Sequence, residues 1–251
     1  MDGLGDILFG PLGSPAQATY LLLRILGELI LCLGLVFIAR RSEVGWLLAA
    51  ASFAMTILAG LFNLPFSFLP SGTYLVLYLA SSWIPPVLGL AACIYGLAWF
   101  RRAPDSGAMV RDISLRSFRA TDLVVPLSVA VVYAAAAVLP MVILGSAMPG
   151  MTHTPGAYGS SLTFSFPLGP LILAGLLQGL LVSALLGLAQ RSRWAWLLIV
   201  PAAIAALVGI TLTAQGAVLI FIYLAQAALA VYGWGRWGGL RTDAVPANRN
   251  R

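Results

Sequence analysis

Apart from Arg24, the arginine side chains of this chain lie in or directly beside every second loop between long apolar stretches. Seven apolar stretches can be marked out; the loops between them alternate between arginine-bearing and arginine-free, and the tail bears arginine again. Cytoplasmic loops of membrane proteins retain Arg and Lys, whereas translocated loops lose them. The pattern therefore predicts an all-α, multi-pass protein of the inner (cytoplasmic) membrane, with the N-terminus outside and the C-terminus inside.

The apolar stretches are long enough for membrane spans, since a helix needs about 20 residues to cross a bilayer. We predict seven transmembrane helices at residues 18–39, 45–64, 74–100, 123–147, 166–189, 194–212 and 215–237. The chain, 1–251, is then a single membrane domain with a cytoplasmic tail at 238–251. Pro85 and Pro86 lie in the middle of the third stretch and remove two backbone donors, so we expect that helix to kink or unwind there.

Composition excludes a soluble domain and several classes of function. Only 9% of the residues are charged, against about 25% in soluble domains. All 14 basic residues are arginines, so a retinal protein, which needs a lysine for its Schiff base, is excluded. The arginines lie beside helix ends, where they contact anionic membrane lipids rather than nucleic acid. Cys32 and Cys93 are isolated in apolar stretches and predict neither a disulfide framework nor a metal site.

A short internal repeat relates the two ends of the chain. Segment 39–48 matches segment 189–198 at six of ten positions, and the same offset of 150 residues places Glu28 opposite Gln178. The Tyr-Gly pair at residues 95–96 matches a second Tyr-Gly pair at the end of the seventh stretch. Chance similarity in a background rich in Leu and Ala is the alternative explanation.

The repeat predicts two three-helix units, at 18–100 and 166–237, joined by a connector helix at 123–147. One connecting helix leaves both units in the same orientation, which is a 3+1+3 parallel repeat. Parallel repeats of this kind occur in transporters, where the binding site lies near mid-membrane between the repeats. We therefore expect a site at the interface of the two units.

The first and last stretches resemble those of one transporter family. Residues 27–30 read GELI and residues 232–237 read YGWGRW. A glutamate in the first helix and a Tyr-Gly-Trp-x-x-Trp signature in the seventh are similar to the PnuC family of nicotinamide riboside transporters. This chain differs in having leucine after Trp46 and Trp196, where the family usually has proline.

The resemblance implies both an architecture and an activity. It implies the 3+1+3 arrangement, like that of the SWEET sugar transporters, and facilitated diffusion of a small vitamin-type solute such as nicotinamide riboside. It also implies that a separate intracellular kinase traps the solute by phosphorylation. Relatives in the family carry thiamine or riboflavin.

Glu28 is the one acid well inside a predicted span. A buried charge costs at least about 2.5–3.5 kcal/mol on insertion scales, so this carboxylate needs a partner or a water-filled cavity. Arg24 lies one turn earlier on the same face of the helix. Glu28 therefore either pairs with Arg24 to orient the helix or contacts a solute or a proton in the pathway, and the two roles are compatible.

Neutral polar groups supply the other candidate binding residues. Gln178 and Gln226 offer amide donors and an acceptor, which suit a carboxamide or sugar hydroxyls but also tie neighbouring helices together. Tyr95, Tyr223 and Tyr232 combine an aromatic ring with a polar tip, and we assign them to the pathway.

Two tryptophans complete the predicted site. Trp46 and Trp196 lie near the cytoplasmic ends of their stretches. They belong either to the aromatic belt at the membrane interface or to a surface that stacks on a flat cationic ring such as nicotinamide.

Transport is the function that these residues favour. The single histidine, His153, lies in a predicted external loop, so it is not placed to form a Ser–His pair or a zinc site inside the membrane. One buried acid is too few for a pair of catalytic carboxylates. We therefore expect no enzyme activity, no catalytic residues, no metal and no cofactor. A non-transporting integral membrane subunit or assembly protein is the alternative, and the sequence is compatible with a homo-oligomer.

Overall fold

The computed structural model describes residues 15–62, 72–102, 120–147, 168–213 and 217–239. These residues form seven α-helices: α2 (Pro15–Ala39), α3 (Glu43–Phe62), α4 (Gly72–Arg102), α5 (Ala120–Ala147), α6 (Leu168–Ala189), α7 (Ala195–Thr213) and α8 (Ala217–Gly239). Each helix begins and ends within three residues of a predicted span. The all-α prediction is confirmed for the part of the chain that the structure describes.

The helices have the length and composition of membrane spans. Four helical segments are long and apolar enough to cross a bilayer: Pro15–Ala39, Glu43–Phe62, Ser82–Arg102 and Ala217–Gly238. Shorter apolar segments lie within α5, α6 and α7. Large apolar side chains such as Leu22, Phe221 and Val231 are exposed on the outer faces, where they would contact lipid tails. The chain is therefore a multi-pass membrane protein.

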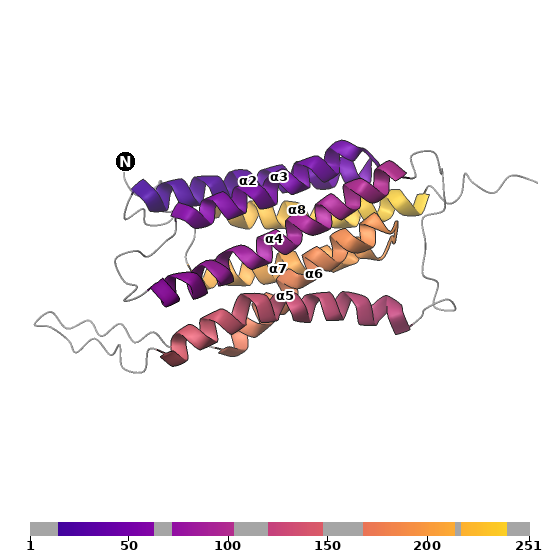
Figure 1. The fold of residues 1–251 in the computed structure, drawn as a ribbon. Helices are drawn as coiled ribbons and strands as arrows, with labels where there is room; N and C mark the ends of the chain where they lie inside the picture. Colours follow the sequence, from indigo (N-terminus) through magenta and orange to yellow (C-terminus); the bar gives the residue numbers. More distant parts are fainter. Residues whose placement is uncertain (1–14, 63–71, 103–119, 148–167, 214–216, 240–251) are drawn as a thin grey trace, which may run out of the picture.

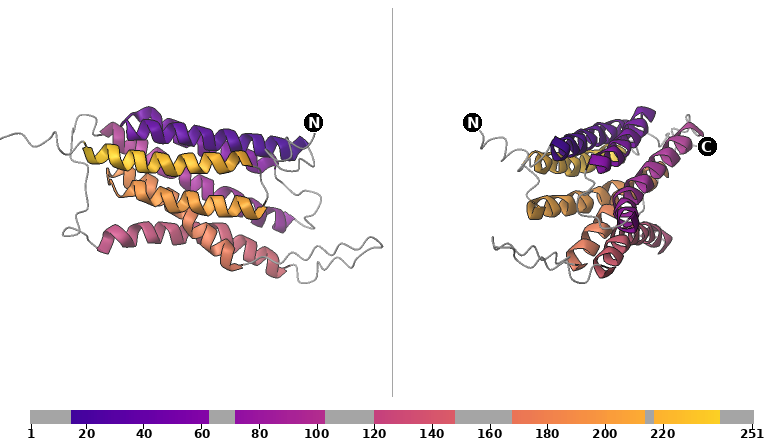
Figure 2. Two further views of the ribbon diagram at one scale, coloured as in Figure 1. Left: turned by 180° about the vertical axis from the view of Figure 1, so that it is seen from behind. Right: turned by 60° about the vertical axis from the view of Figure 1, so that its left-hand side comes forward.

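The helices pack side by side as one bundle (Figures 1 and 2). Helices α2, α3 and α4 form one triplet, and helices α6, α7 and α8 form another. In each triplet, helices that are consecutive in the sequence pack against each other. Two further contacts, α2 with α8 and α4 with α6, join these triplets. Helix α5 contacts α4 and α6 and lies at the edge of the bundle away from α2 and α3.

Helix α4 does not unwind at its two prolines. It runs as one helix from Gly72 to Arg102 with Pro85 and Pro86 inside it, so of the two expected outcomes, a kink or an unwinding, the structure contradicts the unwinding. Both prolines are buried. Each proline leaves a backbone carbonyl without its usual N–H donor. Such carbonyls are tolerated inside a membrane where protein covers them, and the burial of both prolines shows that neighbouring helices cover this part of α4.

The two segments with similar sequence form the same turn. Arg41 and Arg191 both adopt a left-handed backbone conformation, with φ of 58° and 60°. In each turn the arginine N–H donates to the carbonyl three residues earlier and the next serine N–H donates to the carbonyl five residues earlier, all at 2.9 Å. This is the Schellman ending of a helix. The similarity of segments 39–48 and 189–198 thus corresponds to a shared geometry.

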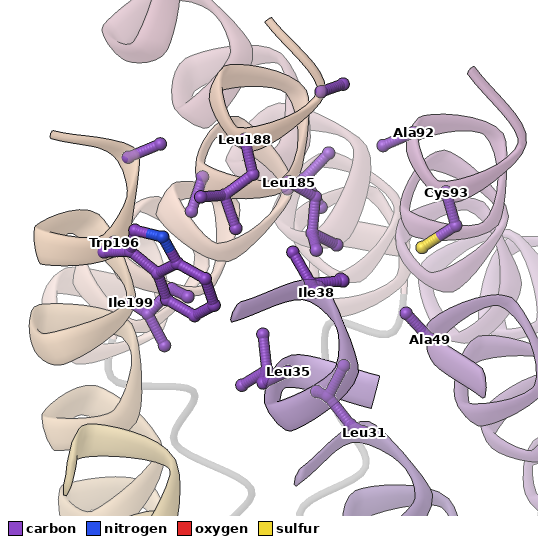
Figure 3. Close-up of a cluster of buried hydrophobic side chains, with 14 of the residues drawn as sticks. Leu31, Leu35, Ile38, Ala49, Ala92, Cys93, Leu185, Leu188, Trp196 and Ile199 are labelled. Carbon is purple, nitrogen blue, oxygen red and sulfur yellow. The ribbon is translucent and has the colours of Figure 1, made fainter. Parts of the chain in front are cut away.

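The tightest part of the core lies next to these turns. Its largest fully buried side chains include Leu35 and Ile38 on α2, Leu185 and Leu188 on α6, and Trp196 on α7 (Figure 3). All described arginines except Arg24 lie at the same end of the bundle, at helix termini. We call this the arginine-bearing end, and the buried cluster closes the bundle there.

Candidate functional site

A cavity of about 250 Å³ lies in the middle of the bundle. Every one of the seven described helices contributes at least one side chain to its wall. The lining residues are Tyr20, Arg24, Glu28, Leu31, Ser52, Phe53, Thr56, Ala59, Pro86, Tyr133, Gln178, Leu181, Val182, Ala202, Ala206, Tyr223 and Gln226. Most of these residues lie near the middle of their helices, so the cavity is at membrane depth.

The carboxylate of Glu28 is held by two side chains of α8. The Tyr223 hydroxyl donates to Oε1 at 2.7 Å, and Gln226 Nε2 donates to Oε2, also at 2.7 Å. Residues three apart on a helix share a face, so α8 presents both donors to α2 together. Both donors are buried, and short hydrogen bonds to a carboxylate are about twice as strong as those between neutral groups.

Arg24 joins this arrangement through Tyr223. Its Nη1 donates to the Tyr20 hydroxyl at 3.3 Å, and its side chain also hydrogen-bonds the Tyr223 hydroxyl. The Tyr223 hydroxyl therefore stands between Arg24 and Glu28, and both charged groups line the cavity. Arg24 and Glu28 are therefore connected through the hydroxyl of Tyr223.

Gln178 faces the cavity from α6. Within the part of the chain that the structure describes, its amide has no hydrogen-bond partner and its side chain keeps exposed surface. An amide with free donors and a free acceptor can bind a solute, whereas Gln226 already gives one of its two Nε2 hydrogens to Glu28.

The cavity wall is built largely from matched positions. At the offset of 150 residues, lining residues pair as Glu28 with Gln178, Leu31 with Leu181, Ser52 with Ala202 and Thr56 with Ala206. At the offset of 137 residues, Pro86 pairs with Tyr223. The pairs differ in polarity: α3 contributes two hydroxyls where α7 contributes two methyl groups. The wall formed by α3 is therefore more polar than the wall formed by α7.

Four of the aromatic residues predicted for the site lie outside the cavity. Trp46 and Trp196 are only 3% and 0% exposed and pack against Gly96 and Gly233. Neither indole is among the side chains that line the cavity, so a stacking or an interfacial role for Trp46 and Trp196 stays a prediction. A side chain at either glycine would occupy the space of the indole ring, which explains the Tyr-Gly pairs as packing motifs.

The tyrosines of these pairs point away from the cavity. Tyr95 is 39% exposed and Tyr232 is 44% exposed, and neither lines the cavity, so their assignment to the pathway stays a prediction that this structure does not support. The reason is helical geometry: Tyr232 follows Tyr223 by nine residues, which is about 180° around the helix axis at 3.6 residues per turn. When Tyr223 faces the cavity, Tyr232 must face outward.

Several polar lining residues were missed by the sequence reasoning. Tyr20, Ser52, Thr56 and Tyr133 all reach the cavity. The spacing of Ser52 and Thr56, four residues apart in an apolar stretch, was a usable signal, because such residues share one helix face. No local signal distinguished Tyr133, since α5 has no counterpart in the sequence similarity between the two ends of the chain. Among the residues that the structure describes, no three His, Cys, Asp or Glu side chains cluster as a metal site.

Comparisons with known proteins agree with this architecture. No protein-family model and no curated protein sequence matches the chain. Among solved structures, the crystal structure of the vitamin B3 transporter PnuC matches with a TM-score of 0.51 and 14% identity, over 92% of this chain and 85% of that one. At this identity the likeness shows a shared fold. The resemblance to the PnuC family is confirmed at the level of the fold, for a divergent chain.

Proposed function

We propose that this chain is a membrane transporter that carries a small vitamin-type solute, such as nicotinamide riboside, across the cytoplasmic membrane by facilitated diffusion. The observation that carries the proposal is the cavity at the centre of all seven described helices, with an acid and polar groups on its wall. Ionisable residues inside a membrane are costly and mark solute or ion pathways. The fold shared with the vitamin B3 transporter supports the same conclusion.

The size and polarity of the cavity suit one small solute. Its volume of about 250 Å³ lies just below the range of about 300–1,000 Å³ typical of ligand pockets. The Glu28 carboxylate attracts a cationic ring, and the Gln178 amide binds a carboxamide or ribose hydroxyls. Phe53 and Tyr133 supply aromatic surface for stacking.

We further propose that α2–α4 and α6–α8 are parallel repeats and that α5 connects them, with the N-terminus outside. The two equivalent Schellman turns and the matched lining pairs support this arrangement. The contacts between the triplets support it too. If α2 corresponds to α6 and α4 to α8, the α2–α8 contact and the α6–α4 contact are equivalent. A homo-oligomer stays a prediction.

Rocking of one triplet against the other would expose the cavity alternately to the two sides of the membrane. In the structure the buried cluster at the arginine-bearing end lies between the cavity and that end. Its members Leu35 and Leu185 are one turn beyond the lining residues Leu31 and Leu181 on their helices. This state is therefore closed at the end that we propose to be cytoplasmic.

Counterflow in proteoliposomes tests the proposal. Liposomes loaded with unlabelled nicotinamide riboside should accumulate the labelled compound from outside without any ion gradient. The double substitution Glu28→Ala, Gln226→Ala should abolish accumulation, whereas Tyr95→Phe, on the outer face, should not change it. No counterflow of nicotinamide riboside, thiamine or riboflavin by folded protein would contradict the proposal and favour the non-transporting alternative.

A further inference from the structure

Tyr133 on α5 and Gln178 on α6 are polar side chains of the cavity wall that have no hydrogen-bond partner within the described part of the chain. Tyr133 is only 9% exposed. Among the described residues, the buried side-chain atoms that lack both a partner and exposed surface belong to Trp83 and Trp196, so the Tyr133 hydroxyl faces open space. The polar groups of α2 and α8, by contrast, already bond to one another.

The two unpartnered side chains start from neighbouring points of the α5–α6 interface. A side chain added at Gly179, the residue after Gln178, would meet Tyr133 Cβ at 3.0 Å. From there both side chains reach the same cavity. The hydroxyl and the amide together therefore offer hydrogen-bond donors and acceptors to one bound molecule.

The internal repeat explains why this part of the wall lacks internal partners. At the offset of 150 residues, Glu28 corresponds to Gln178. At the offset of 137 residues, the two α8 donors that hold Glu28 correspond to Pro86 and Gly89 on α4. Neither proline nor glycine has a polar side chain to offer Gln178. One half of the wall is thus satisfied internally, whereas the other half keeps polar groups for a solute.

We propose that Tyr133 is a specificity-determining residue whose hydroxyl, together with the Gln178 amide, binds sugar hydroxyls of the transported cation. This inference rests on the proposed transport function and deepens it, because it gives α5, which lies outside both triplets, a direct contact with the solute. Sugar hydroxyls donate and accept hydrogen bonds, as these two side chains do. The Glu28 carboxylate acts electrostatically on Tyr133, so a neutral group suits this subsite better than an anion.

Two cations with the same ring test this subsite. Nicotinamide riboside carries a ribose, whereas N-methylnicotinamide has the same ring, charge and carboxamide with a methyl group in place of the sugar. Titration calorimetry of the full chain in detergent should show that the wild type binds the riboside tighter by about tenfold or more, because a site built to bind hydroxyls rejects a molecule that lacks them.

Tyr133→Phe keeps the aromatic ring and removes only the hydroxyl. It should weaken binding of the riboside by about three- to tenfold, the range for one neutral hydrogen bond, and leave binding of N-methylnicotinamide unchanged. Gln178→Leu should have the same selective effect, and it serves if the phenylalanine variant does not fold. Ser183→Ala is the matched control. The Ser183 hydroxyl donates to the Pro126 carbonyl across the α5–α6 interface but does not line the cavity, so the ratio of the two affinities should stay as in the wild type.

Each outcome separates this inference from the proposal beneath it. Equal binding of the two cations by the wild type would overturn the sugar subsite while leaving transport intact. A riboside preference that Tyr133→Phe leaves unchanged would overturn the role of Tyr133. So would a change of the affinity ratio by Ser183→Ala as large as that by Tyr133→Phe. Binding of neither cation by folded wild-type protein would overturn the nicotinamide-type solute and the inference together.

Discussion

Replacing Tyr223 with phenylalanine tests the central hydrogen-bond arrangement, and the same helix offers a matched control. Tyr223→Phe removes the 2.7 Å hydrogen bond to Glu28 and the contact with Arg24, while the aromatic ring stays. Tyr232→Phe makes the same chemical change on the outer face of α8, where the hydroxyl accepts only a 3.3 Å hydrogen bond from Arg236.

The expected loss follows from two sets of magnitudes. A hydrogen bond to a charged group contributes about 1.5–3 kcal/mol in proteins generally. Hydrogen bonds between membrane helices average about 0.6 kcal/mol, with a maximum of about 1.7 kcal/mol. The Tyr223 bond is short, buried and made to a carboxylate, so we expect Tyr223→Phe to lower the free energy of unfolding by about 1–2 kcal/mol. Tyr232→Phe should change it by less than about 0.5 kcal/mol.

Two measurements check this prediction. Reversible unfolding in mixed micelles gives the change in free energy for both variants, and counterflow in liposomes gives the change in transport. Tyr223→Phe should reduce both quantities, since Glu28 loses one of the two donors that hold it at the cavity wall. A loss from Tyr232→Phe as large as that from Tyr223→Phe would refute the assignment of the two faces of α8.

Two further predictions concern packing and surface charge. Gly233→Ala should destabilise the protein by about 1–3 kcal/mol, because the added methyl group would overlap the ring of Trp196. Gly235→Ala is the control: no atom lies within 4 Å of the position of its added methyl group, so this variant should be neutral or stabilising. Equal melting temperatures for the two variants would contradict this packing. A double-mutant cycle on Glu43 and Arg101, whose side chains are 47% and 60% exposed, should give a coupling energy below about 1 kcal/mol that decreases with added salt. A larger, salt-independent coupling would show that this pair is buried in the membrane-embedded protein.

Local signals sufficed to predict the helices and their ends. Long apolar runs bounded by arginines, proline and glycine located all seven described helices to within three residues. The six-in-ten identity of segments 39–48 and 189–198 also predicted that the two turns correspond, and both turns have the same left-handed residue. These features depend on the hydropathy and backbone preferences of residues that are neighbours in the chain, so a single sequence is enough to predict them.

The candidate site was predicted in part. Glu28, Gln178, Tyr223 and Gln226 stood out as polar groups in apolar stretches, and the structure brings all four to one cavity. The same reasoning could not tell Tyr223 from Tyr232, because residue type alone does not reveal which face of a helix points inward. Their spacing of nine residues places the two side chains on opposite faces of the helix. Which of the two faces the cavity is decided by packing alone.

By itself, the sequence determined an all-α membrane chain, the limits of its helices and the small set of polar groups placed among apolar ones. Hydropathy, arginine placement and proline positions act locally, so they can be read along the chain. The tertiary structure decided which side chains share a cavity, that the Tyr223 hydroxyl contacts both Arg24 and Glu28, and that Trp46 and Trp196 fill the space beside glycines. In a helix with apolar residues on every face, the inward face is chosen by close packing against neighbouring helices, and that choice depends on residues far apart in the sequence.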